Sequence, residues 1–165
     1  MKLWLKRWQA VLLSCILAAI GSGCGREPSA PVPPETVLEQ QFCQVSMAGT
    51  EISGQYSRSL EGQSVFVVET PGEIAGMQVH RSETEYTVSV TGLSVKCSGE
   101  AMEQSLFGRV FTALDALEDS VWNNGSWTAS LSDGTGLTAR TQETGRITVI
   151  TVPLWQLTIR FPEKR

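Results

Sequence analysis

Cys24 is the residue whose type and surroundings most clearly indicate chemistry in this chain. It follows a basic start, an apolar run over residues 10–20 and three small residues at positions 21–23. The apolar run is much shorter than the roughly 20 residues that a membrane-spanning helix needs, so this pattern is typical of a cleaved leader. We therefore expect residues 1–23 to be a signal peptide and Cys24 to be the first residue of the mature protein.

The order of basic, apolar and small residues followed by cysteine resembles the bacterial lipobox. The resemblance implies that the Cys24 thiol receives diacylglycerol, whose palmitate-type acyl chains anchor a protein stably in a membrane. Members of this family prefer Leu three residues before the cysteine, where this chain has Gly21. Cys15 is a rival, but cleavage before it would leave an apolar region of about five residues, too few for export. One alternative stays open: an ordinary secretory signal peptide, which would leave Cys24 unmodified.

Cys43 and Cys97 are the two cysteines that remain, and an exported domain permits a disulfide between them. Each lies in an alternating strand pattern on the same side as its apolar neighbours, so both thiols are expected to point into the core. In a simple meander, the intervening strands are spaced about 4.8 Å apart and would hold the two cysteines beyond bonding distance. A strongly curled sheet could bring them together, so a disulfide and two buried free thiols both stay open.

Other residue types that perform catalysis or bind metals are sparse. His80 is the single histidine, it lies on the polar side of its strand pattern, and no clustered carboxylates accompany it as in a zinc site. No serine lies in a Gly-x-Ser-x-Gly context, and no glycine-rich phosphate-binding motif follows a strand pattern. The sequence therefore predicts a protein that is not an enzyme and that uses no metal and no cofactor.

The mature chain from Cys24 onward has the size of one domain and a negative charge. Its 142 residues include 10 basic and 17 acidic ones. This balance argues against nucleic acid as a partner and against electrostatic attachment to an anionic membrane, so we expect the lipid to supply the attachment. The proline-rich residues 24–37 are expected to form a tether, and residues 38–165 the folded domain.

Ten short runs with an apolar residue at every second position predict an antiparallel β-sheet. They cover residues 41–48, 51–59, 64–70, 76–81, 85–91, 93–98, 127–132, 135–141, 146–152 and 154–161. One amphipathic helix is expected over residues 100–119, because its apolar residues recur at spacings of three and four. The predicted fold class is α+β, with nine or ten antiparallel strands in a curled sheet and one main helix on one face.

The order of strands, one helix and strands behind a lipobox and a tether resembles the LolA/LolB and LppX-like lipoprotein-carrier superfamily. Two stretches carry the resemblance. The first is Thr-Pro-Gly-Glu-Ile-Ala-Gly-Met-Gln-Val over residues 70–79, followed by Tyr86 and Gly92. The second runs from Gly125 to Phe161. The resemblance implies an incomplete β-barrel with the helix on its concave side, although this chain lacks a substantial helix before its first strand.

The resemblance also implies an apolar cavity between helix and sheet that holds an acyl chain or a lipid. The residues that would line it are those of the apolar helix face: Leu106, Phe107, Val110, Phe111 and Leu114. The alternative interpretation of this face is ordinary core filling. The corresponding functions are a lipid-binding envelope lipoprotein and a non-catalytic interaction or sensory module that engages an envelope protein. Either would lie on the extracytoplasmic side of the cell membrane, and in the periplasm if the host has an outer membrane.

Overall fold

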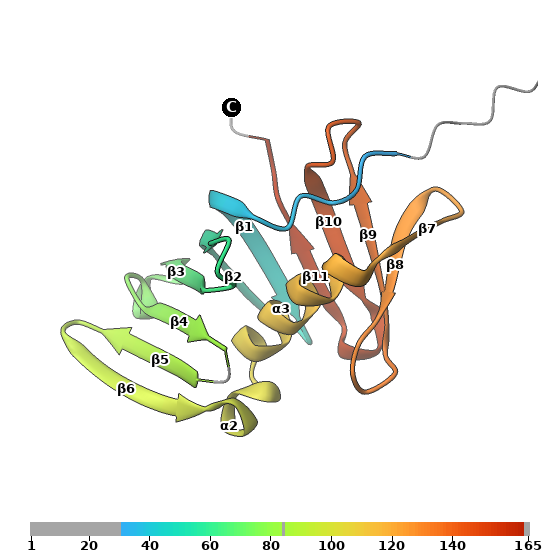
Figure 1. Ribbon diagram of the computed structural model, residues 1–165. Coiled ribbons are helices and arrows are strands. Elements are labelled where there is room, and N and C mark those ends of the chain that lie inside the picture. The colour runs from blue at the N-terminus through green and yellow to red at the C-terminus, as the bar shows by residue number, and fades with distance from the viewer. Residues whose placement is uncertain (1–30, 84, 164–165) are drawn as a thin grey trace, which may run out of the picture. The chain divides into compact units, whose positions relative to one another are not determined.

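The structure is a computed structural model that describes residues 31–83 and 85–163, which belong to one compact unit (Figure 1). The expected signal peptide and Cys24 lie outside the described residues. No helix within the described ranges is long and apolar enough to cross a membrane.

Eleven strands form a single antiparallel sheet (Figure 1). They are β1 (Leu38–Met47), β2 (Thr50–Arg58), β3 (Ser64–Thr70), β4 (Gln78–Ser82), β5 (Glu85–Val90), β6 (Leu93–Ser98), β7 (Val121–Asn123), β8 (Ser126–Ser130), β9 (Gly136–Thr141), β10 (Ile147–Val152) and β11 (Leu157–Arg160). Their spatial order is β6-β5-β4-β3-β2-β1-β11-β10-β9-β8-β7, so the first and last strands pair at the centre of the sheet. In the described part of the chain β6 and β7 are the two edges, and the sheet is therefore open rather than closed.

The expected α+β class is confirmed, but the expected count of nine or ten strands is wrong. The additional strand is β7, whose three residues pair with β8 from Val121 to Asn123. A strand of this length is too short to show a two-residue period in the sequence. The turn that follows it has positive φ angles of 46° at Asn124 and 83° at Gly125, the geometry of a tight hairpin.

The helical segment consists of α2 (Gly99–Glu103), α3 (Leu106–Asp115) and the 3-10 turn η2 (Ala116–Asp119), so the expectation of one continuous helix over 100–119 is wrong. Outside this segment, two more 3-10 turns lie between strands: η1 (Gly72–Ile74) and η3 (Pro153–Trp155). The break between α2 and α3 comes at Ser105, whose backbone is extended and whose Oγ accepts a hydrogen bond from the Gly108 N–H at 3.0 Å. The serine cap starts a new helix at this point, since it satisfies one of the free N–H groups of the first turn.

α3 packs on one face of the sheet, which we call the inner face (Figure 1). The alternation along the strands directs large apolar side chains to this face, and Tyr56, Phe66 and Ile159 are among those with no exposed surface. Val110 and Phe111 of α3 are equally buried against them. The main core of the protein therefore lies between the inner face and α3.

The residues before β1 are docked on the sheet rather than projecting from it. Glu35 donates its backbone N–H to the Gly145 carbonyl in the β9–β10 turn at 3.0 Å. A Cβ atom at Gly145 would lie 2.5 Å from the Pro33 carbonyl oxygen, so a glycine is needed for this close approach. The end of the segment that composition assigns to the tether therefore enters the domain beside the β9–β10 turn.

Candidate functional site

The five residues of the expected cavity lining all belong to α3, and they differ in burial along the helix. Val110, Phe111 and Leu114 are buried, whereas Leu106 and Phe107 in the first turn are half-buried. The Phe111 ring lies 6.0 Å from the Tyr56 ring and 5.9 Å from the Tyr86 ring, measured between centroids. Phe111 therefore packs between aromatic side chains of β2 and β5 as a core residue does.

The first turn of α3 contacts the sheet at β3, where the Phe107 and Phe66 rings meet edge to face with 5.5 Å between their centroids. Phe66 begins a row of inner-face residues that are direct cross-strand partners in β3, β4, β5 and β6: Phe66, Val79, Val88 and Val95. Exposure rises along this row, because Phe66 and Val79 are fully buried, Val88 is half-buried and Val95 is 61% exposed. The cover that α3 gives to the inner face therefore ends before the sheet does.

Three apolar side chains at this end of the inner face are exposed, and we call them the apolar strip: Val90, Leu93 and Val95. Val90 and Leu93 face each other across the β5–β6 hairpin, and Leu93 is 76% exposed. Strand alternation in the sequence correctly directs these residues toward the inner face. The sequence does not show that these side chains are exposed. Their exposure depends on how far α3 covers the sheet, and a local sequence pattern carries no information about that.

A group of charged residues fastens the other end of α3 to the sheet. Arg58 of β2 places Nη1 3.2 Å from Asp115 Oδ1 and Nη2 2.8 Å from Glu118 Oε1. Arg81 of β4 also contacts Asp115. The Nη1 atoms of both arginines are buried, and both approach the carboxylate of Asp115. The Arg58 side chain is only 9% exposed, and salt therefore screens its ion pairs less than those of a surface arginine.

These ion pairs explain a feature of the sequence that helix electrostatics does not. Asp115, Glu118 and Asp119 lie near the C-terminal end of the helical segment, where the helix dipole disfavours negative charge. Arg58 and Arg81 neutralise the first two of these acids from strands that are distant in sequence. The sequence does not reveal these ion pairs, because no local pattern links β2 or β4 to this end of α3.

Cys43 and Cys97 are free thiols in the structure, so the disulfide alternative is not realised. Both lie on the inner face as expected, but four strands separate β1 from β6. Cys43 has no exposed surface, and this burial, together with the nearby Glu69 charge, raises the pKa of its thiol to about 12. Cys97 is half-buried beside Tyr86, its partner across the β5–β6 ladder.

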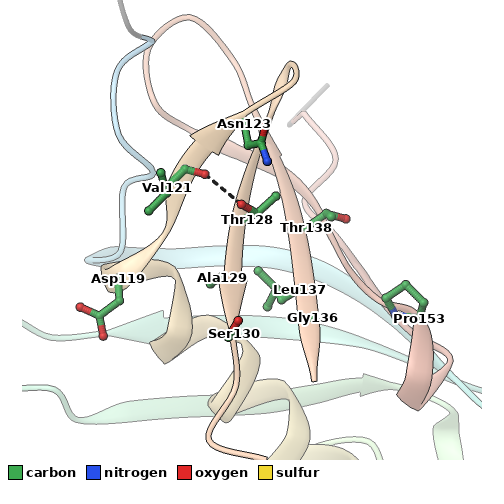
Figure 2. Close-up of a pocket in the computed structure, with 10 residues that line it drawn as sticks. All are labelled: Asp119, Val121, Asn123, Thr128, Ala129, Ser130, Gly136, Leu137, Thr138 and Pro153. Atoms are coloured by element: carbon green, nitrogen blue, oxygen red, sulfur yellow. Dashed lines mark hydrogen bonds between the residues drawn. The ribbon is translucent and has the colours of Figure 1, made fainter. Parts of the chain in front are cut away.

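The most voluminous of three surface depressions is an open groove of about 740 Å³ over β7, β8 and β9 (Figure 2). Its lining includes Val121, Thr128, Thr138 and Pro153, and the Thr128 hydroxyl donates to the Val121 carbonyl at 3.2 Å. The other two depressions lie over β1–β2 and beside α2. None of these three is lined by the five residues of the expected cavity.

His80 lies exposed on β4, where its Nε2 is 3.2 Å from Oε1 of Gln78. Within residues 31–83 and 85–163, no three His, Cys, Asp or Glu side chains converge in a way that could hold a metal ion.

No protein-family model matches the chain, and no curated protein matches it.

Proposed function

We propose that this protein is a membrane-anchored envelope lipoprotein that binds the acyl chain of a lipid on the inner face of its sheet. The anchor would be diacylglycerol on Cys24, as the lipobox-like leader indicates. The protein would act without catalysis, and the ligand would enter where α3 no longer covers the sheet. The resemblance to the LolA/LolB and LppX-like superfamily supports this proposal, because it implies an incomplete β-barrel whose concave side holds a lipid.

The observation that carries the proposal is the apolar strip. Val90, Leu93 and Val95 continue the inner face beyond the buried Phe66 and Val79, so an apolar surface runs from the core to solvent. A row of this kind suits a long, thin apolar ligand. Each methylene group that it removed from water would contribute about 0.8 kcal/mol.

The two ends of the helical segment differ in the way the proposal requires. Arg58 and Arg81 hold Asp115 and Glu118 at the C-terminal end. At the other end Leu106, Phe107 and Met102 are half-buried against the core. Phe107 contacts Phe66, the residue that begins the row leading across the sheet to Val95. Apolar contacts can be exchanged for an acyl chain at little cost, whereas buried charges cannot. We therefore place ligand entry at the strip and next to the first turn of α3, away from Asp115 and Glu118.

The second candidate function is an interaction module that engages an envelope protein. It is favoured by one observation: the strip borders β6, an edge strand whose outer backbone groups pair with no other described strand. Such an edge can accept an additional strand from a partner. In this case the close packing of Phe111 with Tyr56 and Tyr86 would reflect a solid core.

Native mass spectrometry of the full chain, purified from membranes in mild detergent, tests the proposal. We expect two observations: a mature N-terminus at a diacylated Cys24, and a dissociable adduct with the mass of a lipid. A protein that repeatedly carries no adduct, and that instead co-purifies stoichiometrically with one envelope protein, would favour the interaction module. A start elsewhere than Cys24, or an unmodified thiol there, would reject the anchor.

A further inference from the structure

Charge is distributed unevenly along the domain. Residues 31–139 contain 4 basic and 14 acidic residues, whereas residues 140–165 contain 5 basic and 2 acidic ones. The overall negative charge argues against membrane attraction for the domain as a whole. Screening limits the reach of each charge to about 10 Å, however, so the local distribution decides how one surface interacts.

Two of these basic residues lie on the face of the sheet opposite to α3, and a third lies in the adjoining β9–β10 turn. Arg140 of β9 and Arg160 of β11 are both direct partners of Val149 in β10, so they share one face with about 10 Å between their backbones. Arg146 is half-buried in the β9–β10 turn, directly before Ile147 of β10. We call these three residues the arginine face.

The arginine face has few compensating charges. None of its three side chains forms an ion pair within the described ranges, in contrast to Arg58, Arg81 and Lys96. The two carboxylates at this end of the sheet are Glu143 and Glu163. Glu163 accepts a hydrogen bond from Gln142 Nε2 at 2.6 Å, and Glu143 is exposed in the β9–β10 turn.

The chain enters the domain at the same place. The contacts of Glu35 and Pro33 with Gly145 hold the N-terminal segment beside the β9–β10 turn. In the sequence, Gly145 lies between Arg140 and Arg146. Six residues separate Cys24 from Pro31, and even when fully extended this length spans at most about 25 Å. A lipid on Cys24 would therefore keep this turn near the membrane surface.

We propose that in the anchored protein the arginine face docks on an anionic membrane surface and sets the orientation of the domain. This inference rests on the proposed anchoring at Cys24. The β5–β6 turn, with the apolar strip, lies at the opposite end of the strands and at the far edge of the sheet. Docking would thus direct the strip away from the anchoring membrane. Each arginine near an anionic surface would favour the docked state about fivefold, and added salt would remove this preference.

The test uses the full lipidated chain in vesicles of phosphatidylcholine, with or without phosphatidylglycerol. A fluorophore is placed at Thr144→Cys in the β9–β10 turn, or at Thr91→Cys in the β5–β6 turn, in both cases in a Cys97→Ser background. Energy transfer to a headgroup-labelled lipid reports the proximity of each turn to the membrane. We expect transfer from position 144 to rise at least twofold when phosphatidylglycerol is present, and transfer from position 91 to stay low.

Matched charge variants complete the experiment. Arg140→Gln together with Arg160→Gln should return transfer from position 144 to the level in neutral vesicles. Lys96→Gln, which removes an exposed charge on β6, should change nothing. Equal transfer in both kinds of vesicle, a rise at position 91, or equal effects of the arginine and lysine variants would overturn the proposal. Failure of the protein to float with neutral vesicles would instead reject the anchor itself.

Discussion

Arg58 and Asp115 join the sheet to the main helix through a nearly buried ion pair, with 3.2 Å between Nη1 and Oδ1. Glu118 and Arg81 extend the pair to four residues from β2, β4, α3 and η2. The same helix makes aromatic contacts at its other end, through Phe107 and Phe66. The inner face is therefore held by charge at one end of the helix and by apolar packing at the other.

Replacement of Arg58 by Gln should lower the free energy of unfolding by about 2 kcal/mol. This value lies between the cost for an exposed pair and that for a fully buried one, because Arg58 is 9% and Asp115 30% exposed. Lys96→Gln is the control, since its pair with Glu85 is exposed and 3.6 Å long, and it should cost less than about 0.5 kcal/mol. Urea unfolding measures both. Equal losses in the two variants would show that the cluster does not fasten the helix.

Phe111→Ala should lower the free energy of unfolding by about 3–5 kcal/mol, the range for a large aromatic residue in tightly packed core. Phe111 has no exposed surface and contacts the Tyr56 and Tyr86 rings. Leu154→Ala, at a side chain that is 77% exposed, serves as control and should change stability by less than about 0.5 kcal/mol. If Phe111→Ala changes stability little and abolishes lipid binding, residue 111 lines the cavity instead.

Gly108→Ala should destabilise the protein although alanine is the better helix former. A Cβ atom at this position would lie 2.0 Å from the Met102 carbonyl oxygen, so α2 would have to move away from α3. Such overpacking costs about 1–3 kcal/mol, which exceeds the roughly 1 kcal/mol that alanine gains over glycine in a helix. Gly72→Ala, where no atom lies within 4 Å, is the matched control for thermal unfolding. A Gly108→Ala variant as stable as the parent protein would contradict the close α2–α3 packing.

Stability should fall as the pH rises from about 9 to 12. Burial raises the pKa of the Cys43 thiol from 9.0 to about 12, with a smaller contribution from Glu69, and burial raises the pKa of Tyr56 from 10.0 to about 12. In this window the unfolded chain loses protons that the folded protein retains, so ionisation favours unfolding. Urea midpoints at several pH values measure the slope, which Cys43→Ala combined with Tyr56→Phe should reduce. A slope that the double variant leaves unchanged would mean that these two groups do not cause it.

Much of the fold could be predicted from the sequence because strand alternation is a local signal. Each of the ten expected runs overlaps a strand. The fold class and the inner-face direction of Leu93, Val95 and Cys97 follow from the two-residue period. The failures have local causes too: β7 is too short for a period, and the cap at Ser105 divides a continuous apolar pattern.

The candidate site was less predictable because it depends on contacts between distant segments. The helix pattern correctly marks Val110, Phe111 and Leu114 as facing the sheet, but it cannot show where their cover ends. The pairing of Arg58 with Asp115 and the exposure of Leu93 both arise from the position of α3 on the sheet, which the final packing determines.

Titration with a fluorescent fatty acid shows whether the exposed end of the inner face binds an acyl chain. The full chain should bind the probe with a rise in emission, and Leu93→Gln combined with Val95→Gln should weaken binding about tenfold, a loss of about 1.4 kcal/mol. Both side chains are exposed, so stability should change little. Leu60→Gln, at a leucine in the β2–β3 turn that is 89% exposed, should bind as the parent protein does. No binding by the parent chain, or equal binding by the strip and control variants, would contradict acyl-chain binding at this end of the inner face.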